Sequence, residues 1–174
     1  MKILQVPFIE QQMNNDCVIA CLEMIFRYLK TQYKEIAIFS RKELLKILDI
    51  SVIGTRICDV ELLNEHKKLE NHRWRPKFHC SPGSIGHIWE QIDKEQPIIA
   101  YIVKRFLGNQ IKHAILINGY SKDKTELSIC DPLEEQQTII STGEFQEKWK
   151  LFLQYHVYYD VTEVLQPKIT EFID

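Results

Sequence analysis

A cysteine at the expected start of a buried helix is the clearest candidate for chemistry. Cys17 follows a polar run, residues 11–16, and precedes the segment 18–29, which is apolar on nearly every side. This pattern predicts a helix that is buried around most of its circumference, with Asn15 or Asp16 as its N-cap. A helix N-terminus has partial positive charge and free amide groups, which lower the pKa of a thiol in the first turn. Cys17 is therefore a candidate nucleophile, and its usual cationic partner would be a histidine.

One of the six histidines lies where a hairpin can place a carboxylate beside it. Residues 113–120 and 125–130 are predicted strands that flank a turn-like segment, 121–124. If the turn holds three or five residues, His113 lies opposite Asp131 on one face of the sheet. A four-residue turn without a bulge shifts the pairing by one and puts them on opposite faces, so both registers stay open. In the first register His113 is a candidate general base and Asp131 orients its ring.

Acyl transfer also needs hydrogen-bond donors for the developing oxyanion. The backbone amide of Cys17 can supply one, and a glutamine side chain can supply the second. Gln11 lies six residues before Cys17 and can loop back beside the start of the helix, with Gln12 as the alternative.

Composition predicts one globular domain over residues 1–174. The chain has a formal charge of -2, from 22 Lys and Arg against 24 Asp and Glu, and 45% of its residues are hydrophobic. The absence of a basic excess argues against nucleic acid as a partner. We find no apolar run of the length that spans a membrane, and residues 1–7 lack the apolar stretch of a classical export signal.

The order of elements predicts an α+β fold, with a helical N-terminal half packed on an antiparallel β-sheet. Ser40 and Ser141 each begin a capping box, and Asp59 can cap a helix that continues to Leu69. Further predicted elements are a short strand within 71–82, a helix at 84–95, and strands at 98–103 and 154–161. Lys104 and Arg105 are expected to be solvated charges.

The odd number of cysteines disfavours a disulfide framework, so we expect all five thiols to be reduced and the protein to be cytosolic. Cys21 and Cys130 are expected in the core, and Cys58 and Cys80 are read as structural or incidental. A zinc site formed by Cys17, Cys21, His79 and Cys80 is disfavoured, because its two ligand pairs do not both have the spacing that is usual in structural zinc sites. His66, His72 and His87 are expected at the surface, while His156 can face either the core or solvent. No metal or organic cofactor is required.

Four segments in order resemble the bacteriocin-processing, double-glycine cysteine peptidase family. They are residues 11–17, 113–120, 129–132 and 141–149, and the resemblance extends from about Val6 to Leu153. It implies a papain-like cysteine proteinase fold, with Cys17 as nucleophile, His113 as general base, Asp131 as orienting residue and Gln11 as oxyanion donor.

The sequence also departs from the family pattern. Val18 stands where the family has glycine after the nucleophile, and we expect it to narrow the approach of a substrate chain. The membrane and ATPase domains that often follow this peptidase are not within these 174 residues, so we expect a stand-alone bacterial relative.

The leading hypothesis is a thiol hydrolase that cleaves a peptide or amide bond of a peptide or protein substrate through an acyl-enzyme on Cys17. An acyltransferase or deamidase that uses the same triad is the alternative among enzymes, since a fold does not determine the acceptor. A catalytically silent peptide-binding module is the alternative outside them. A specialised secretion signal need not be apolar, so a host-directed effector stays open beside the cytosolic reading, and the sequence leaves the oligomeric state open.

Overall fold

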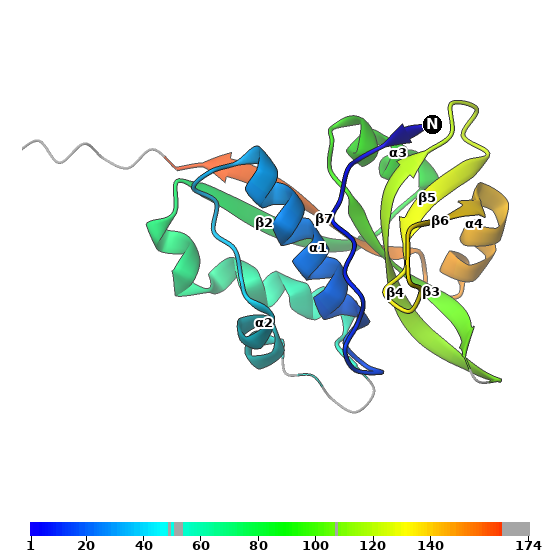
Figure 1. Cartoon of the computed structure of the whole chain (residues 1–174), viewed down its shortest axis with the longest axis horizontal. Coiled ribbons are helices and arrows are strands. Elements are labelled where there is room, and N and C mark those ends of the chain that lie inside the picture. Colours follow the sequence, from blue (N-terminus) through cyan, green and yellow to red (C-terminus); the bar gives the residue numbers. More distant parts are fainter. Residues whose placement is uncertain (49, 51–53, 107, 165–174) are drawn as a thin grey trace, which may run out of the picture.

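The structure is a computed structural model that describes residues 1–48, 50, 54–106 and 108–164. Helices occupy much of the N-terminal part and an antiparallel sheet forms most of the remainder, so the predicted α+β class is confirmed (Figure 1). The last ten residues of the expected domain lie outside the described part. No helix within that part is long and apolar enough to cross a membrane.

Helices predominate between residues 17 and 71, and strands predominate from Trp74 onward. The helices are α1 (Cys17–Gln32), α2 (Arg41–Ile47), α3 (Ile85–Asp93) and α4 (Thr142–Lys150), with 3-10 helices η1 (Ile57–Glu65) and η2 (Lys67–Asn71). The strands are β1 (Lys2–Ile3), β2 (Trp74–Pro82), β3 (Ile98–Phe106), β4 (Asn109–Tyr120), β5 (Glu126–Cys130), β6 (Thr138–Ser141) and β7 (Tyr155–Glu163). The sheet order is β2-β7-β3-β4-β5-β6, and β1 adds to β4.

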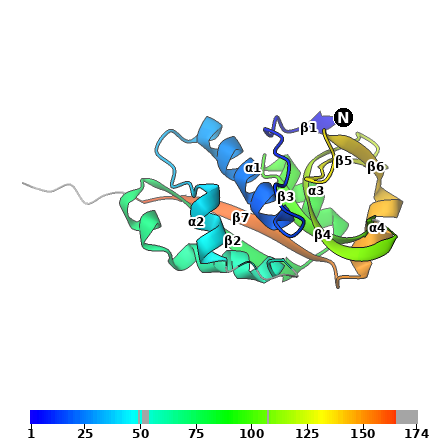
Figure 2. The ribbon, with the colours of Figure 1, turned by 60° about the horizontal axis from the view of Figure 1, so that its bottom comes forward.

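Helix α1 is enclosed by the rest of the fold. Eleven of its sixteen residues are buried, which follows from the apolar character of residues 18–29. The ribbon of β2 and β7 extends away from the other strands to run along α1 (Figures 1 and 2). Phe26 of α1 packs edge-on against Phe78 of β2, with ring centroids 5.7 Å apart. These contacts hold α1 against the β2–β7 ribbon.

The N-cap of α1 is Asp16, one of the two candidates that the sequence offered, but its carboxylate does not cap the helix. It is fully buried and forms an ion pair with Arg41 of α2. It also accepts hydrogen bonds from the backbone amides of Gln12 and Met13, at 3.4 and 3.2 Å. The carboxylate therefore fixes the loop that leads into Cys17 and ties this loop to α2.

Most of the other predicted elements are present, with one correction among the helices. Ser40 forms the predicted capping box with Glu43, and the Ser141 side chain caps α4. The helix expected to start at Asp59 is instead a pair of 3-10 helices, the first of which begins at Ile57 with Arg56 as its N-cap. The predicted short strand in 71–82 is the nine-residue β2.

The hairpin of β4 and β5 has a register that neither sequence alternative gave. Leu116 pairs with Cys130, whereas Tyr120 pairs with Leu127, and the register shifts between Ile117 and Gly119. The amide of Ser121 donates to Glu126, so the loop comprises residues 122–125. The four-residue loop alone would put His113 and Asp131 on opposite faces of the sheet, but the one-residue shift of register reverses this. His113 and Asp131 therefore share a face, displaced along the strands rather than directly opposite.

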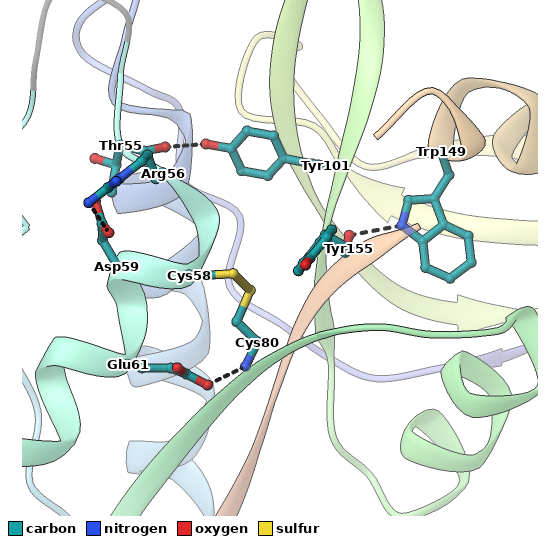
Figure 3. Close-up of a disulfide and its surroundings, with 9 residues drawn as sticks. All are labelled: Thr55, Arg56, Cys58, Asp59, Glu61, Cys80, Tyr101, Trp149 and Tyr155. Atoms are coloured by element: carbon teal, nitrogen blue, oxygen red, sulfur yellow. Dashed lines mark hydrogen bonds and ion pairs between the residues drawn. A yellow bond between two sulfur atoms is a disulfide. The ribbon is translucent and has the colours of Figure 1, made fainter. Parts of the chain in front are cut away.

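A disulfide joins Cys58 of η1 to Cys80 of β2 (Figure 3). The expectation that all five thiols are reduced is therefore wrong for these two residues. The Glu61 carboxylate accepts a hydrogen bond from the Cys80 amide at 2.8 Å, and the Asn64 side chain forms two hydrogen bonds with the backbone of Phe78. Because structural disulfides are rare in the cytosol, the argument from reduced thiols to cytosolic residence loses its basis.

We predict that this disulfide stabilises the fold by about 3 kcal/mol, from the loop entropy of a sequence separation of 22. The variant Cys58→Ser/Cys80→Ser should lose this free energy of unfolding in urea titrations. Dithiothreitol should destabilise the wild type to the level of the double variant and leave the variant unchanged. Alkylation of the unfolded, unreduced wild type should label three cysteines, and labelling of all five would contradict the disulfide.

Candidate active site

The thiol of Cys17 lies where the N-terminus of α1 meets β4. Its Sγ accepts a hydrogen bond from the backbone amide of Ala114 at 3.4 Å. Cys17 is 8% exposed, so the sulfur is largely shielded but reaches a cavity described below. The burial of α1 brings the first turn of the helix onto the strand that carries His113.

His113 and Asp131 are in direct contact. Nε2 of His113 is 2.5 Å from Oδ1 of Asp131, and both residues are buried. Oδ1 also accepts a hydrogen bond from the amide of Leu133 at 2.9 Å, which holds the carboxylate in the turn after β5. With Asp131 ionised, Nε2 carries the proton, so Nδ1 is the ring nitrogen left to exchange a proton with the thiol. The structure thus brings Cys17, His113 and Asp131 together.

Burial and charge compete in setting the protonation of this pair. Burial alone would lower the pKa of His113, but hydrogen bonds to Asp131 and Cys17 outweigh it and raise the pKa above its ordinary value. Burial would raise the pKa of Asp131, yet His113, Lys104 and the Leu133 amide lower it to about 2. The arrangement therefore favours the imidazolium form of His113 more than water does, and it keeps the carboxylate of Asp131 ionised.

The other two free cysteines have a different environment. Burial raises the pKa of the Cys21 thiol well above its ordinary value, and nearby Cys17 adds to the shift. Burial also raises the pKa of Cys130 to about 11. Both are fully buried, as predicted for core residues, and both thiols stay protonated at neutral pH.

Gln11 lies beside the segment that follows Asp131. Its backbone amide donates to the carbonyl of Pro132 at 3.0 Å, which fixes the polar loop against this turn. Its side-chain Nε2 donates to the carbonyl of Met13 at 2.8 Å. The amide group is therefore engaged within its own loop in this structure rather than directed at the sulfur. Gln12 is exposed.

Lys104 of β3 is a residue whose surroundings differ from the sequence-based expectation. It was expected to be solvated, but its side chain is only 20% exposed. Its Nζ lies 2.6 Å from Oδ2 of Asp131 and 2.6 Å from an oxygen of Glu134. Arg105, the next residue, is exposed as expected. No local pattern marks Lys104, because its partner comes from a segment 27 residues away.

A cavity of about 990 Å³ opens beside Cys17. Leu133 and Ile111 line it from the sheet side, so it reaches both segments that carry the candidate base and carboxylate. Most of its lining is apolar. The apolar and aromatic residues around it are Leu48, Ile57, Leu62, Tyr101, Ile111, Leu133, Phe152 and Tyr155.

One wall of the cavity is the segment 54–59, which is held from two sides (Figure 3). The hydroxyl of Tyr101 on β3 donates to the carbonyl of Thr55, and the disulfide of Cys58 ties the same segment to β2. At its start, Gly54 has a φ of +93° and lies against Asn15, where a Cβ would be 3.2 Å from the carbonyl oxygen. Glycine is therefore required for this approach to the loop before Cys17.

The structure corrects the expectations for Val18 and His87, and it agrees with the expectation that the zinc site is disfavoured. Val18 is 1% exposed in the core and is not among the residues that line the cavity, so it does not narrow it. Cys80 is bonded to Cys58 and cannot be the thiolate ligand of the zinc alternative. His87 is half-buried and forms a hydrogen bond of 2.7 Å with His156, which is fully buried. Within the described residues, no group of three or more His, Cys, Asp or Glu side chains could hold a metal ion.

Comparisons with known proteins bear on the fold and the family of the chain. Among solved structures, the chain is similar to the "putative C39-like peptidase from Bacillus anthracis", with a TM-score of 0.68 and 14% sequence identity. The similarity covers 94% of this chain and 100% of the other, and it shows a shared papain-like fold. A comparison with curated proteins finds no match.

The sequence model of the Peptidase C39 family matches residues 5–156, which is most of the chain. This match includes the start of α1, the β4–β5 hairpin and α4, the regions that carry the resemblance found in the sequence. It indicates a cysteine peptidase-like hydrolase with peptides as its substrate class. The chain belongs to the Peptidase C39 family, whose members are bacteriocin-processing-like cysteine peptidases.

Proposed function

We propose that the protein cleaves a peptide or amide bond through an acyl-enzyme on Cys17, with His113 as general base and Asp131 as orienting residue. The observation that carries this proposal is the position of His113: its ring contacts Asp131 through Nε2 at 2.5 Å, and the backbone amide of the next residue, Ala114, donates to Sγ of Cys17 at 3.4 Å. A nucleophile, a base and an orienting carboxylate in contact are the arrangement that thiol peptidases need.

In the proposed mechanism, His113 Nδ1 holds the proton of the Cys17 thiol as an imidazolium. The thiolate attacks the substrate carbonyl carbon, and a tetrahedral oxyanion forms. When it collapses, the C–N bond breaks and His113 protonates the leaving amine, which leaves a thioester on Cys17. His113 then takes a proton from water, whose oxygen attacks the thioester and releases the acid and the thiol.

The oxyanion would be stabilised by the backbone amide of Cys17 and the side-chain amide of Gln11. The loop of Gln11 is anchored to Pro132 and leads directly into the N-terminus of α1. For this role, Nε2 of Gln11 exchanges the Met13 carbonyl for the oxyanion when substrate binds. Gln12 is the less suitable donor because it is exposed.

The cavity favours substrates with bulky apolar side chains. Its wall is already held in place by Tyr101 and the disulfide, so its shape does not depend on substrate. Lys112 lies over the ring of Phe152 at 5.4 Å, and Arg56 pairs with Asp59. These charges are partnered within the protein, which leaves apolar surface as the main contact for substrate.

The first prediction from this mechanism is that Cys17 alone is alkylated rapidly by iodoacetamide below pH 7. The raised pKa of His113 keeps its cation present through pH 6.5 and upward, and this cation is lost only as pH rises through the raised value. Asp131, with a pKa lowered to about 2, is ionised throughout a titration from pH 4 to 9. Mass spectrometry identifies the labelled residue, and Cys21 and Cys130 are internal references.

His113→Ala should reduce the rate of Cys17 alkylation at pH 6 by at least about tenfold. Asp131→Asn tests the orienting role, and its rate of Cys17 alkylation should lie between the rates of the wild type and of His113→Ala. The proposed triad is wrong if Cys17 is alkylated no faster than Cys21 and Cys130. It is also wrong if the alkylation rate of Cys17 is the same in His113→Ala as in the wild type. The silent peptide-binding module would then be the better description.

A second prediction separates the two glutamines. Gln11→Ala should lower kcat by roughly 100-fold with a small change in KM, as expected when an oxyanion donor is lost. Gln12→Ala is the matched control and should retain its activity. Equal effects of the two substitutions would refute the assignment of Gln11. Mapping the products on peptides from a proteome digest also distinguishes hydrolysis from acyl transfer, because a transferase joins the acyl group to an amine.

A third prediction concerns the cavity. Leu62 is 54% exposed and lines it, so Leu62→Glu can add a charge there without disturbing the core. We expect KM for apolar peptides to rise at least about tenfold with little change in kcat. Leu151→Glu, at a 65% exposed residue outside the cavity lining, is the control. Equal KM values for the two variants would show that substrate does not use the cavity.

A further inference from the structure

Lys104 lies on the same face of the sheet as His113. Ile102 of β3 pairs with His113 of β4, and Lys104 follows two residues later, so its side chain returns to that face. The ammonium group reaches across to the turn after β5 and contacts Asp131 and Glu134, each at 2.6 Å. A cation from a third strand therefore contacts the carboxylate that contacts His113.

The two oxygens of Asp131 have different partners. Oδ1 accepts from His113 Nε2 and from the Leu133 amide. The hydrogen bond to Oδ2 from the described part of the chain comes from Lys104. Asp131 is only 4% exposed, and a buried carboxylate is costly unless both oxygens are paired. Lys104 thus supplies the partner that the second oxygen needs.

We propose that Lys104 is a positioning residue that holds Asp131 ionised and turned so that Oδ1 faces His113. Lys104 does not line the cavity beside Cys17, so it acts through Asp131 rather than on the substrate. This inference rests on the proposed function, because it assigns a role within the same triad. Glu134 has a supporting role: it holds the ammonium group from the other side.

The direction of the electrostatic effect follows from the charges around the site. Removing a cation disfavours negative charge nearby, so the Asp131 carboxylate should form at higher pH without Lys104, and the thiolate–imidazolium pair that alkylation reports should shift in the same direction. The titratable groups that surround Asp131 and Lys104 are His113, Cys17, Cys21, Cys130 and Glu134. Cys21 and Cys130 stay protonated because they are buried, so they contribute no opposing charge near neutral pH.

The test is the pH dependence of Cys17 alkylation in Lys104→Met. We expect the acid limb of the profile to move upward by roughly half a pH unit or more. The maximal rate constant kcat for peptide cleavage should fall about tenfold, with KM little changed, as expected when one charge-assisted hydrogen bond is lost. Lys104→Arg keeps the charge and the donors, and it should restore the acid limb toward the wild-type position.

Arg105→Met is the matched control, because it removes a positive charge from the next residue of the same strand. Arg105 is exposed and its side chain faces away from His113. The pH profile of Cys17 alkylation in Arg105→Met should therefore coincide with that of the wild type. Near-ultraviolet circular dichroism checks that each variant is folded. Where Lys104→Met is not folded, Lys104→Gln provides the same comparison.

A double-mutant cycle tests whether Lys104 acts through Asp131. In the background of Asp131→Asn, adding Lys104→Met should reduce kcat by less than twofold, because the carboxylate it holds is gone. Additive tenfold effects would overturn the proposal, as would a Lys104→Met profile that matches the wild type. If alkylation of Cys17 does not depend on His113, the triad itself is refuted. Failure of the Lys104 proposal can therefore be distinguished from failure of the proposed function.

Discussion

The burial of α1 is the constraint on which the rest of the structure depends. A helix that is apolar on nearly every side must be covered by separate parts of the chain. The sheet covers it through β4, and the β2–β7 ribbon and α2 cover other sides. Because Cys17 is the first residue of this helix, the same hydrophobic burial that stabilises the fold presses its thiol against the strand of His113.

Two buried carboxylates then fix the orientation of the parts that meet there. Asp16 pairs with Arg41 and holds the loop before Cys17, whereas Asp131 pairs with Lys104 and holds the ring of His113. In both cases the cation comes from a different element, α2 or β3. A buried ion pair contributes little net stability, because desolvation offsets its attraction, but removing one partner is costly. These pairs therefore specify geometry more than they add free energy.

The sequence was sufficient for features that depend on local patterns. The helix that follows Cys17, the capping box of Ser40, the N-cap of Ser141, and the hairpin of β4 and β5 all leave periodicity or capping signals. The exact pairing of the hairpin was missed because it depends on two features together. The loop comprises residues 122–125, and the register shifts by one residue between Ile117 and Gly119, which returns His113 and Asp131 to the same face of the sheet. The disulfide and the contact of Lys104 were missed because each joins segments more than 20 residues apart, which periodicity does not report.

The cavity wall shows how such long-range contacts relate to function. Segment 54–59 contains little regular structure before Ile57, so alone it would not keep a defined shape. Tyr101 anchors it to β3, which pairs with β4, and Cys58 anchors it to β2 at the edge of the sheet. Since both anchors end on the sheet that carries His113, the wall and the candidate base share one framework. A substrate would thus meet a cavity whose position relative to the base is set before it binds, which lowers the entropic cost of reaching a reactive geometry.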